Sequence, residues 1–161
     1  MYKKMEHSLT AYCDADWASD KEDRRSTTAY VVCFSRAAIS WSSKKQRTVA
    51  LSTTEAEYMA MSQATQEVMW LQSLGQKLAI STAGCRLLCD SNGAISVSSG
   101  QPRSSRTNHI DIRQHFVRER HLAGHIYIEQ VATEDNAADM LTKAVTPEHL
   151  QKSMTLIGMT I

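Results

Sequence analysis

Apolar and polar residues alternate with a period of two in three early stretches of the chain, as in strands that bury one face. These stretches are residues 9–14, 28–34 and 38–42. A charged loop at 20–25 separates the first two, and a short turn separates the second from the third. Three consecutive strands with short connections predict an antiparallel meander.

Beyond residue 48 the apolar period changes to three and four residues, which is the spacing of one face of an α-helix. The apolar residues at this spacing are Ala60, Ala64, Val68, Leu71, Leu74 and Leu78. They predict one long helix whose apolar side packs on the sheet.

The second half of the chain alternates between strands and helices. Strands are expected at 85–90 and 126–131, and helices at 91–99, 110–122, 134–143 and 147–157. A meander followed by this alternation predicts an α/β fold with a mixed five-stranded sheet flanked by helices.

Composition limits the class of protein. With 161 residues, 42% of them hydrophobic and 22% charged, the chain is expected to form a single globular domain. A net charge of +1 excludes a histone-like binder, so a polyanion would have to be met by local patches. No stretch approaches the ~20 apolar residues of a membrane span, and no membrane partner is expected.

The cysteines and histidines do not form a recognisable metal motif. Four cysteines, Cys13, Cys33, Cys85 and Cys89, lack a CxxC pair and are expected to be reduced core thiols of an intracellular protein rather than zinc ligands. On one helix, the six-residue spacing of His109, His115 and His121 places them on different faces, and His125 follows the expected helix end at Gly124. Packing roles are therefore expected for His109 and His115.

Four acidic residues are candidates for a common site. Asp14 and Asp90 each follow a cysteine at the end of an apolar strand, so they meet at one edge if those strands are parallel neighbours. Glu57 lies three residues before Ala60, on the apolar side of the long helix. Asp139 lies early in the expected helix at 134–143. Each acid taken alone could also be a surface residue or a helix cap.

Converging carboxylates repel one another and raise each other's pKa unless cations neutralise them. Ligands that are all oxygen atoms favour Mg²⁺, with Mn²⁺ as a substitute. Two such ions about 3.5–4 Å apart can activate a water molecule and stabilise the leaving oxygen of a phosphodiester. If the four acids converge, the sequence therefore favours a site that binds divalent cations.

Five segments in a fixed order resemble the ribonuclease H domain of Pol polyproteins from copia-type LTR retrotransposons. They are YCDADWASD with DRRST (12–20 and 23–27), AISWSSKKQRTVALSTTEAEYMA (38–60), LLCDSNGAI (87–95), SRTNHIDIRQHFVRE (105–119) and TEDNAADMLTK (133–143). The resemblance extends over residues 9–143. It implies a ribonuclease H-like fold and an endonuclease that hydrolyses the RNA strand of RNA–DNA hybrids during reverse transcription.

The resemblance also implies residue roles. It places Asp14, Glu57, Asp90 and Asp139 as catalytic residues and ligands of two Mg²⁺ ions. It suggests that loop residues around the meander line the hybrid groove: Arg24, Arg25, Ser26, Lys44, Lys45, Gln46 and Arg47. The basic side chains would contact phosphates, and the polar side chains would contact sugars. Alternatively, these residues are only solvated charges of surface loops. Trp17 and Trp41 are expected to pack in the core or at its rim.

The resemblance further implies a partner and a domain organisation. Residues 1–8 are expected to be the remnant of a connection from a reverse transcriptase domain of the same polyprotein. Residues 9–145 form the ribonuclease H domain, and 146–161 a C-terminal helical tail. The expected location is the cytoplasm, within virus-like particles, or the nucleus with the integration complex.

Two alternatives remain open at this point. An inactive or host-retained copy would only bind nucleic acid or protein, although the presence of all four acids argues against it. An integrase-type nuclease normally carries three acids, and the STTEAEY segment argues against that class. Residues 131–139 contain no histidine, unlike the loop before the last acid in cellular ribonucleases H, so the group that transfers protons is unassigned.

Overall fold

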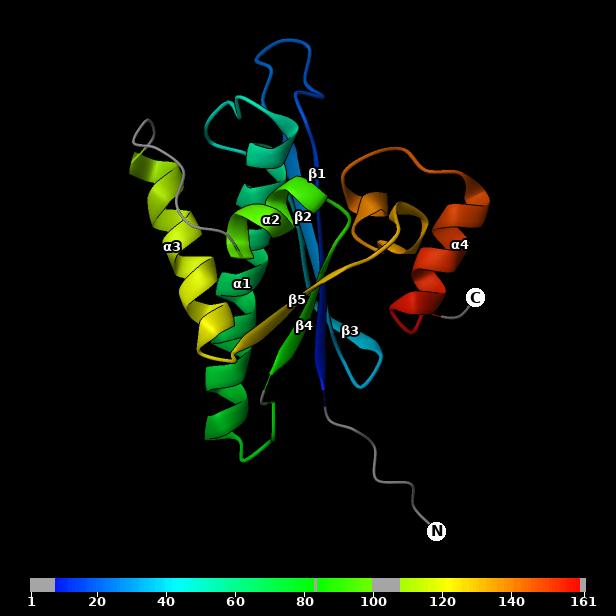
Figure 1. Ribbon diagram of the computed structural model, residues 1–161. Helices are drawn as coiled ribbons and strands as arrows, with labels where there is room; N and C mark the ends of the chain where they lie inside the picture. Colours follow the sequence, from blue (N-terminus) through cyan, green and yellow to red (C-terminus); the bar gives the residue numbers. More distant parts are fainter. Residues whose placement is uncertain (1–7, 83, 100–107, 160–161) are drawn as a thin grey trace.

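The computed structural model describes residues 8–82, 84–99 and 108–159, and its centre is a five-stranded mixed sheet (Figure 1). The strands are β1 (Leu9–Asp16), β2 (Thr27–Phe34), β3 (Ala37–Lys45), β4 (Cys85–Cys89) and β5 (Ile126–Gln130). Their order across the sheet is β3-β2-β1-β4-β5. The expected connection at 1–8 lies outside the described residues except for Ser8.

Strand pairing confirms the predicted antiparallel meander and the predicted mixed sheet. β1, β2 and β3 pair antiparallel as a meander. β1 pairs parallel with β4, and β4 pairs parallel with β5. In the β1–β4 register Tyr12 lies opposite Leu88, so the residues that follow on both strands reach the same edge of the sheet. β1 and β3 extend two and three residues beyond their predicted ends.

Three helices cover one face of the sheet. α1 (Thr53–Lys77) packs on β1 and β2, α2 (Asn92–Ser99) packs on α1, and α3 (Asn108–Leu122) lies beside α1 and reaches β5 (Figure 1). The main hydrophobic core lies between α1 and the sheet. It contains the predicted apolar stripe of α1 from Ala60 to Leu71 and the side chains that alternate towards it on β1 and β4. Leu74 and Leu78, expected in the same stripe, are 37% and 60% exposed, and Leu78 lies beyond the last residue of α1.

The opposite face is covered by short elements: η1 (Thr133–Asp135), η2 (Asp139–Leu141) and α4 (Pro147–Leu156). The predicted continuous helix at 134–143 is therefore wrong. Asn136 interrupts it, with an extended backbone at φ −85° and ψ 100°. Its buried side chain donates to the carbonyl of Cys13 (3.0 Å) and accepts from the amide of Ala138 (3.2 Å). These bonds stabilise the break and attach the segment to β1.

Several other predictions are tested by burial. All four cysteines are buried and free, as expected for core thiols. Trp41 is 64% exposed, so its expected packing is wrong, because it lies near the open edge of the sheet on β3. Trp17 is also exposed, but its ring nitrogen donates to the carbonyl of Ala50 (3.1 Å).

Within the described residues, no helix is long and apolar enough to cross a membrane.

Candidate metal centre

Four acids from separate elements gather at one edge of the sheet. Asp14 lies near the end of β1, Asp90 directly follows β4, Asp139 begins η2, and Glu57 lies in the second turn of α1. Carboxylate oxygens of Asp14, Asp90 and Asp139 lie within 4.8 Å of one another. Ligand atoms of Glu57, Asp90 and Cys89 also lie within 4.8 Å of one another. The structure thus brings together the four acids singled out in the sequence.

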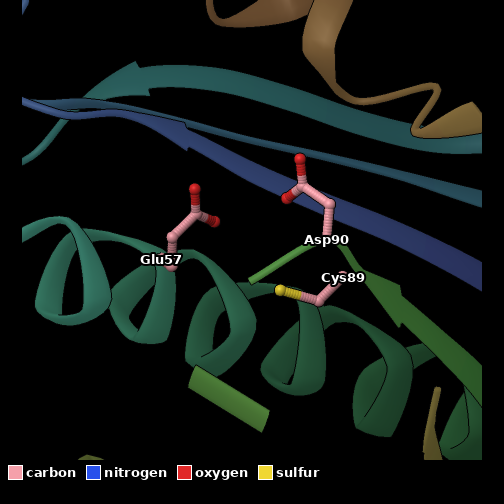
Figure 2. A group of neighbouring side chains, drawn as sticks. All are labelled: Glu57, Cys89 and Asp90. Carbon is pink, nitrogen blue, oxygen red and sulfur yellow. The ribbon is translucent and has the colours of Figure 1, made fainter. Parts of the chain in front are cut away.

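The carboxylates of Glu57 and Asp90 extend into the space between α1 and the strands (Figure 2). Glu57 reaches this space because it lies on the side of α1 that faces the sheet, whereas Glu55 serves the helix N-terminus. The amide of Glu55 donates to the hydroxyl of Ser52 (3.1 Å), and its carboxylate accepts from the amide of Leu51 (2.8 Å). Those two bonds are a capping arrangement.

Burial dominates the electrostatics of the centre. Desolvation raises the pKa of Asp14 to about 6, with a further increase from nearby Asp139, although the Thr142 hydroxyl donates to Asp14 and opposes the shift. Desolvation, and then repulsion by Asp14, raises the pKa of Glu57 to about 9. Burial also raises the pKa of Asp139, against the effect of neighbouring Lys143. Without a cation, the centre therefore favours protonated acids.

Asp139 gives the clearest indication of what fits there. It is 0% exposed, and neither of its carboxylate oxygens receives an aligned hydrogen bond. The ammonium of Lys143 lies 2.9 Å from Oδ2, which makes the contact an ion pair rather than an aligned hydrogen bond. Oε2 of Glu57 is likewise buried without a partner. Buried carboxylate oxygens with few donors around them, in a set of hard ligands, fit a divalent cation such as Mg²⁺ or Mn²⁺.

Sequence reasoning missed three side chains that contact the acids. Thr142 donates to Asp14, and the Thr133 hydroxyl donates to Oδ2 of Asp90 (2.9 Å). Lys143 pairs with Asp139. The four-residue separation of Asp139 and Lys143 was a usable signal, because such pairs meet within one helical turn. No local pattern marks the two threonines.

The residues expected to contact nucleic acid divide into two groups. Ser26 and Gln46 are 0% and 2% exposed, which contradicts the expected sugar contacts. Ser26 accepts from the amide of Ala18 (3.2 Å), and Gln46 donates to the Thr28 hydroxyl (2.7 Å) and the Ala56 carbonyl (3.0 Å). Both side chains therefore form hydrogen bonds inside the protein, although Oε1 of Gln46 is buried without a partner.

The basic loop residues remain available at the surface. Arg24 and Lys44 are exposed. Arg25 pairs with Asp23 at 3.0 Å, and Lys45 pairs with both Asp20 and Asp23. Arg24 and Lys44 are therefore better placed than Arg25 and Lys45 to meet an anion.

A groove of about 480 Å³ lies between β2, β3, α1 and a side chain of α3. Its basic and polar lining comprises Lys44, Lys45, Arg47, Arg113, Ser62, Gln63 and Gln66. Glu67 is the acidic residue of this lining, and it accepts from the Ser40 hydroxyl (2.6 Å). Nη1 of Arg113 is buried without a partner among the described residues. Arg113 was not predicted, because its helix comes from a distant part of the sequence.

The histidines take no part in the acidic cluster among the described side chains. His121 Nδ1 contacts the carbonyl of Ile126 at 3.1 Å, which links α3 to β5. His115 is exposed, so its expected packing role is wrong. The side chain of His109 lies outside the part of the chain that the structure describes.

The chain is similar to segments of retrovirus-related Pol polyproteins. It is 42% identical over 151 residues to the polyprotein of transposon TNT 1-94 from Nicotiana tabacum, covering 94% of this chain and 11% of the polyprotein. It is 41% identical over 154 residues to that of transposon RE1 from Arabidopsis thaliana, covering 95% and 10%. The chain thus spans about a tenth of the length of these curated relatives. No family model matches it.

Solved structures with the same fold are ribonucleases H. The N-terminal ribonuclease H domain of a Mycobacterium tuberculosis protein gives a TM-score of 0.61 at 13% identity, covering 92% of this chain and 96% of that one. LC11 ribonuclease H, in complex with an RNA/DNA hybrid, gives a TM-score of 0.61 at 16% identity, covering 83% and 93%. The ribonuclease H-like fold predicted from the sequence is therefore confirmed.

Proposed function

Because this chain is homologous to a segment of retrovirus-related Pol polyproteins from plant transposons and has the ribonuclease H fold, we propose that it hydrolyses the RNA strand of RNA–DNA hybrids. The observation that carries the proposal is the convergence of Asp14, Asp90 and Asp139, with Glu57 beside them. A four-carboxylate cluster at a sheet edge is expensive to desolvate, so a role with cations accounts for it better than a role in stability.

The four acids would hold two divalent cations, Mg²⁺ by preference and Mn²⁺ as a substitute. When bound, such ions activate a water molecule and stabilise the leaving oxygen of the phosphodiester. The chain itself orients the ligands. The hydroxyls of Thr142 and Thr133 orient the carboxylates of Asp14 and Asp90 by hydrogen bonds. The residues packed around Asp139 exclude bulk water from its carboxylate, which is 0% exposed.

The basic groove supports binding of a nucleic-acid duplex. Within the described residues, Lys44, Arg47 and Arg113 form no ion pair with a carboxylate. The side chains of Gln63 and Gln66 add neutral donors. Such groups contact phosphates and position a duplex without reading its sequence. A hybrid would be distinguished from DNA by its 2′-hydroxyls and groove shape. LC11 ribonuclease H, which has the same fold, has been solved in complex with an RNA/DNA hybrid.

The homology also supports a partner within the same polypeptide. We propose that the reverse transcriptase domain of a Pol polyprotein precedes residue 9 and supplies hybrids to this domain inside virus-like particles. The described part of the C-terminal segment, residues 146–159, packs on the same unit, because α4 contacts η1 and η2 and Ile157 lies in the second hydrophobic cluster.

A cleavage assay with matched substrates tests the proposal. The protein is incubated with end-labelled RNA–DNA hybrid, single-stranded RNA and duplex DNA, each with Mg²⁺ or with excess chelator. The expected result is Mg²⁺-dependent cleavage of RNA in the hybrid alone. Full activity in chelator would reject the metal centre, and equal rates on all three substrates would reject hybrid selectivity. Hybrid binding without cleavage would favour an inactive binding module.

A further inference from the structure

Lys143 is the cationic side chain nearest to Asp139 among the described residues. Its amide donates to the carbonyl of Asp139 (3.1 Å), which closes one turn after η2 and places the two side chains together. Its ammonium lies 2.9 Å from Oδ2 of Asp139. The Asp139 side chain is 0% exposed, whereas that of Lys143 is 39% exposed. Lys143 therefore reaches the acids from the solvent side.

The remaining acids are held by neutral groups. Asp14 accepts from Thr142 and Asp90 accepts from Thr133, and a hydroxyl supplies a hydrogen bond but no positive charge. Carboxylate oxygens of Asp14, Asp90 and Asp139 lie within 4.8 Å of one another. A single ammonium at this position interacts with all of them, since Coulomb interactions at this range remain substantial in a partly buried site.

We propose that Lys143 is the internal counterion of the acidic cluster and that it separates from Asp139 when a divalent cation binds. The inference rests on the proposed metal centre and adds a residue that controls its affinity. The buried oxygens of Asp139 have two candidate partners, the ammonium and the metal ion. Both cannot lie against the same oxygen, because two cations at that distance repel each other.

The side chain of Lys143 is suited to this exchange. Lysine is a compact point charge on a flexible four-carbon stem, and its half-exposed position lets the ammonium move into water without unfolding the turn. Lys143 is thus a positioning residue rather than a catalytic one.

The first test measures metal affinity without substrate. Mn²⁺ is titrated calorimetrically into the wild type and into Lys143→Met, Lys143→Arg and Lys152→Met. Removing the competing charge is expected to tighten Mn²⁺ binding roughly fivefold in Lys143→Met. Lys143→Arg should remain closer to the wild type because it keeps the charge. Lys152→Met is the matched control, since Lys152 pairs with Asp135 at 2.7 Å outside the cluster.

The second test uses the unmodified sequence, so it does not depend on how a variant folds. Lysines are labelled with an amine reagent and quantified by mass spectrometry, with and without saturating Mn²⁺. Mn²⁺ should increase labelling of Lys143 at least about twofold and leave Lys152 unchanged. Unchanged or reduced labelling of Lys143, or equal Mn²⁺ affinity in Lys143→Met, would overturn the exchange. Absence of Mn²⁺ binding by the wild type would instead reject the proposed metal centre, and the exchange with it.

Discussion

Two groups of acids in this molecule have opposite surroundings. In the loop between β1 and β2, Asp20 is held by Lys45 and by the amides of Glu22 and Asp23, and these bonds lower its pKa to about 2. At the sheet edge, burial raises the pKa of Asp14 to about 6. Both groups contain aspartates close to one another in space, yet the loop acids are paired with cations and amides, whereas the sheet-edge acids have a single ammonium, that of Lys143, beside them.

The difference shows how a cluster of acids can be assigned a role. An acid that the protein has already paired gains little from an added metal ion. The sheet-edge acids have hydroxyl partners and a single ammonium, and Asp139 has buried oxygens without aligned donors. We therefore expect the sheet-edge acids to bind metal ions and the loop acids to stabilise the loop.

The largest expected effect is on cleavage. Asp14→Asn or Asp90→Asn should lower the rate of hybrid cleavage at least about 100-fold, because each removes a ligand from a centre that contributes several kcal/mol to the transition state. Asp20→Asn should stay within about twofold of the wild type. Initial rates in Mg²⁺ measure both. If Asp20→Asn lost as much activity as Asp14→Asn, the distinction between the two groups would fail.

The second effect is the pH dependence of stability in chelator. The pKa values of Asp14 and Glu57 are raised in the folded state to about 6 and about 9, so the native state binds more protons than the unfolded chain above pH 4. The free energy of unfolding should therefore decrease as pH rises from about 4 to 9. Tm should fall by at least roughly 3 °C between pH 5 and 8.

Two controls separate this decline from other titrations. Asp14→Asn should flatten the part of the decline below about pH 6, and saturating Mg²⁺ should flatten most of it by neutralising the acids. The lowered pKa of Asp20 has the opposite sign, because its stabilising effect is present above pH 4 and is lost as pH falls towards 2. A Tm in chelator that rises from pH 5 to 8 would contradict the assigned shifts.

A third effect compares two acids on one helix. Glu57→Gln should remove nearly all cleavage, whereas Glu55→Gln should retain it and cost about 0.5–2 kcal/mol of stability, the usual range for a lost cap. The reason is that Glu55 caps the first turn of α1, while Glu57 faces the other acids. Chemical denaturation and cleavage assays on both variants test it. Loss of cleavage in Glu55→Gln alone would reverse the assignment.

The smallest effect concerns the loop acids themselves. Lys45→Met removes the exposed pairs with Asp20 and Asp23, and exposed ion pairs contribute little in water. Its Tm should stay within roughly 2 °C of the wild type. Thermal unfolding at two salt concentrations measures this directly. A larger loss would show that the loop has a structural role beyond solvated charge.

Local periodicity was sufficient for much of the fold and for three of the four acids, whereas Asp139 was placed in a continuous helix that does not form. Asp14 and Asp90 follow apolar strands, and the β1–β4 pairing brings both strands to one edge. Glu57 follows from the apolar face of α1. Periodicity failed at 134–143, where the buried side chain of Asn136 bonds to the carbonyl of Cys13. A helix pattern cannot reveal a partner more than a hundred residues away.

Burial was the other property that the sequence did not reveal. Ser26 and Gln46 are residue types that are common in surface loops, yet both are buried. Gln46 bonds to Thr28 of β2 and to Ala56 of α1, and Ser26 accepts from the amide of Ala18. Arg113 and Lys44 come from distant segments and meet only at the groove.

By itself, the sequence determined most of the strand and helix order, the strand ends that carry Asp14 and Asp90, and the helix face that carries Glu57. These depend on periods of two and 3.6 residues, which are properties of local backbone geometry. The tertiary structure alone decided which acids lack partners, which polar loop residues are enclosed, and that Asp139 is fully buried. Solvent exclusion and charge pairing depend on distances between segments, and no local pattern encodes those distances.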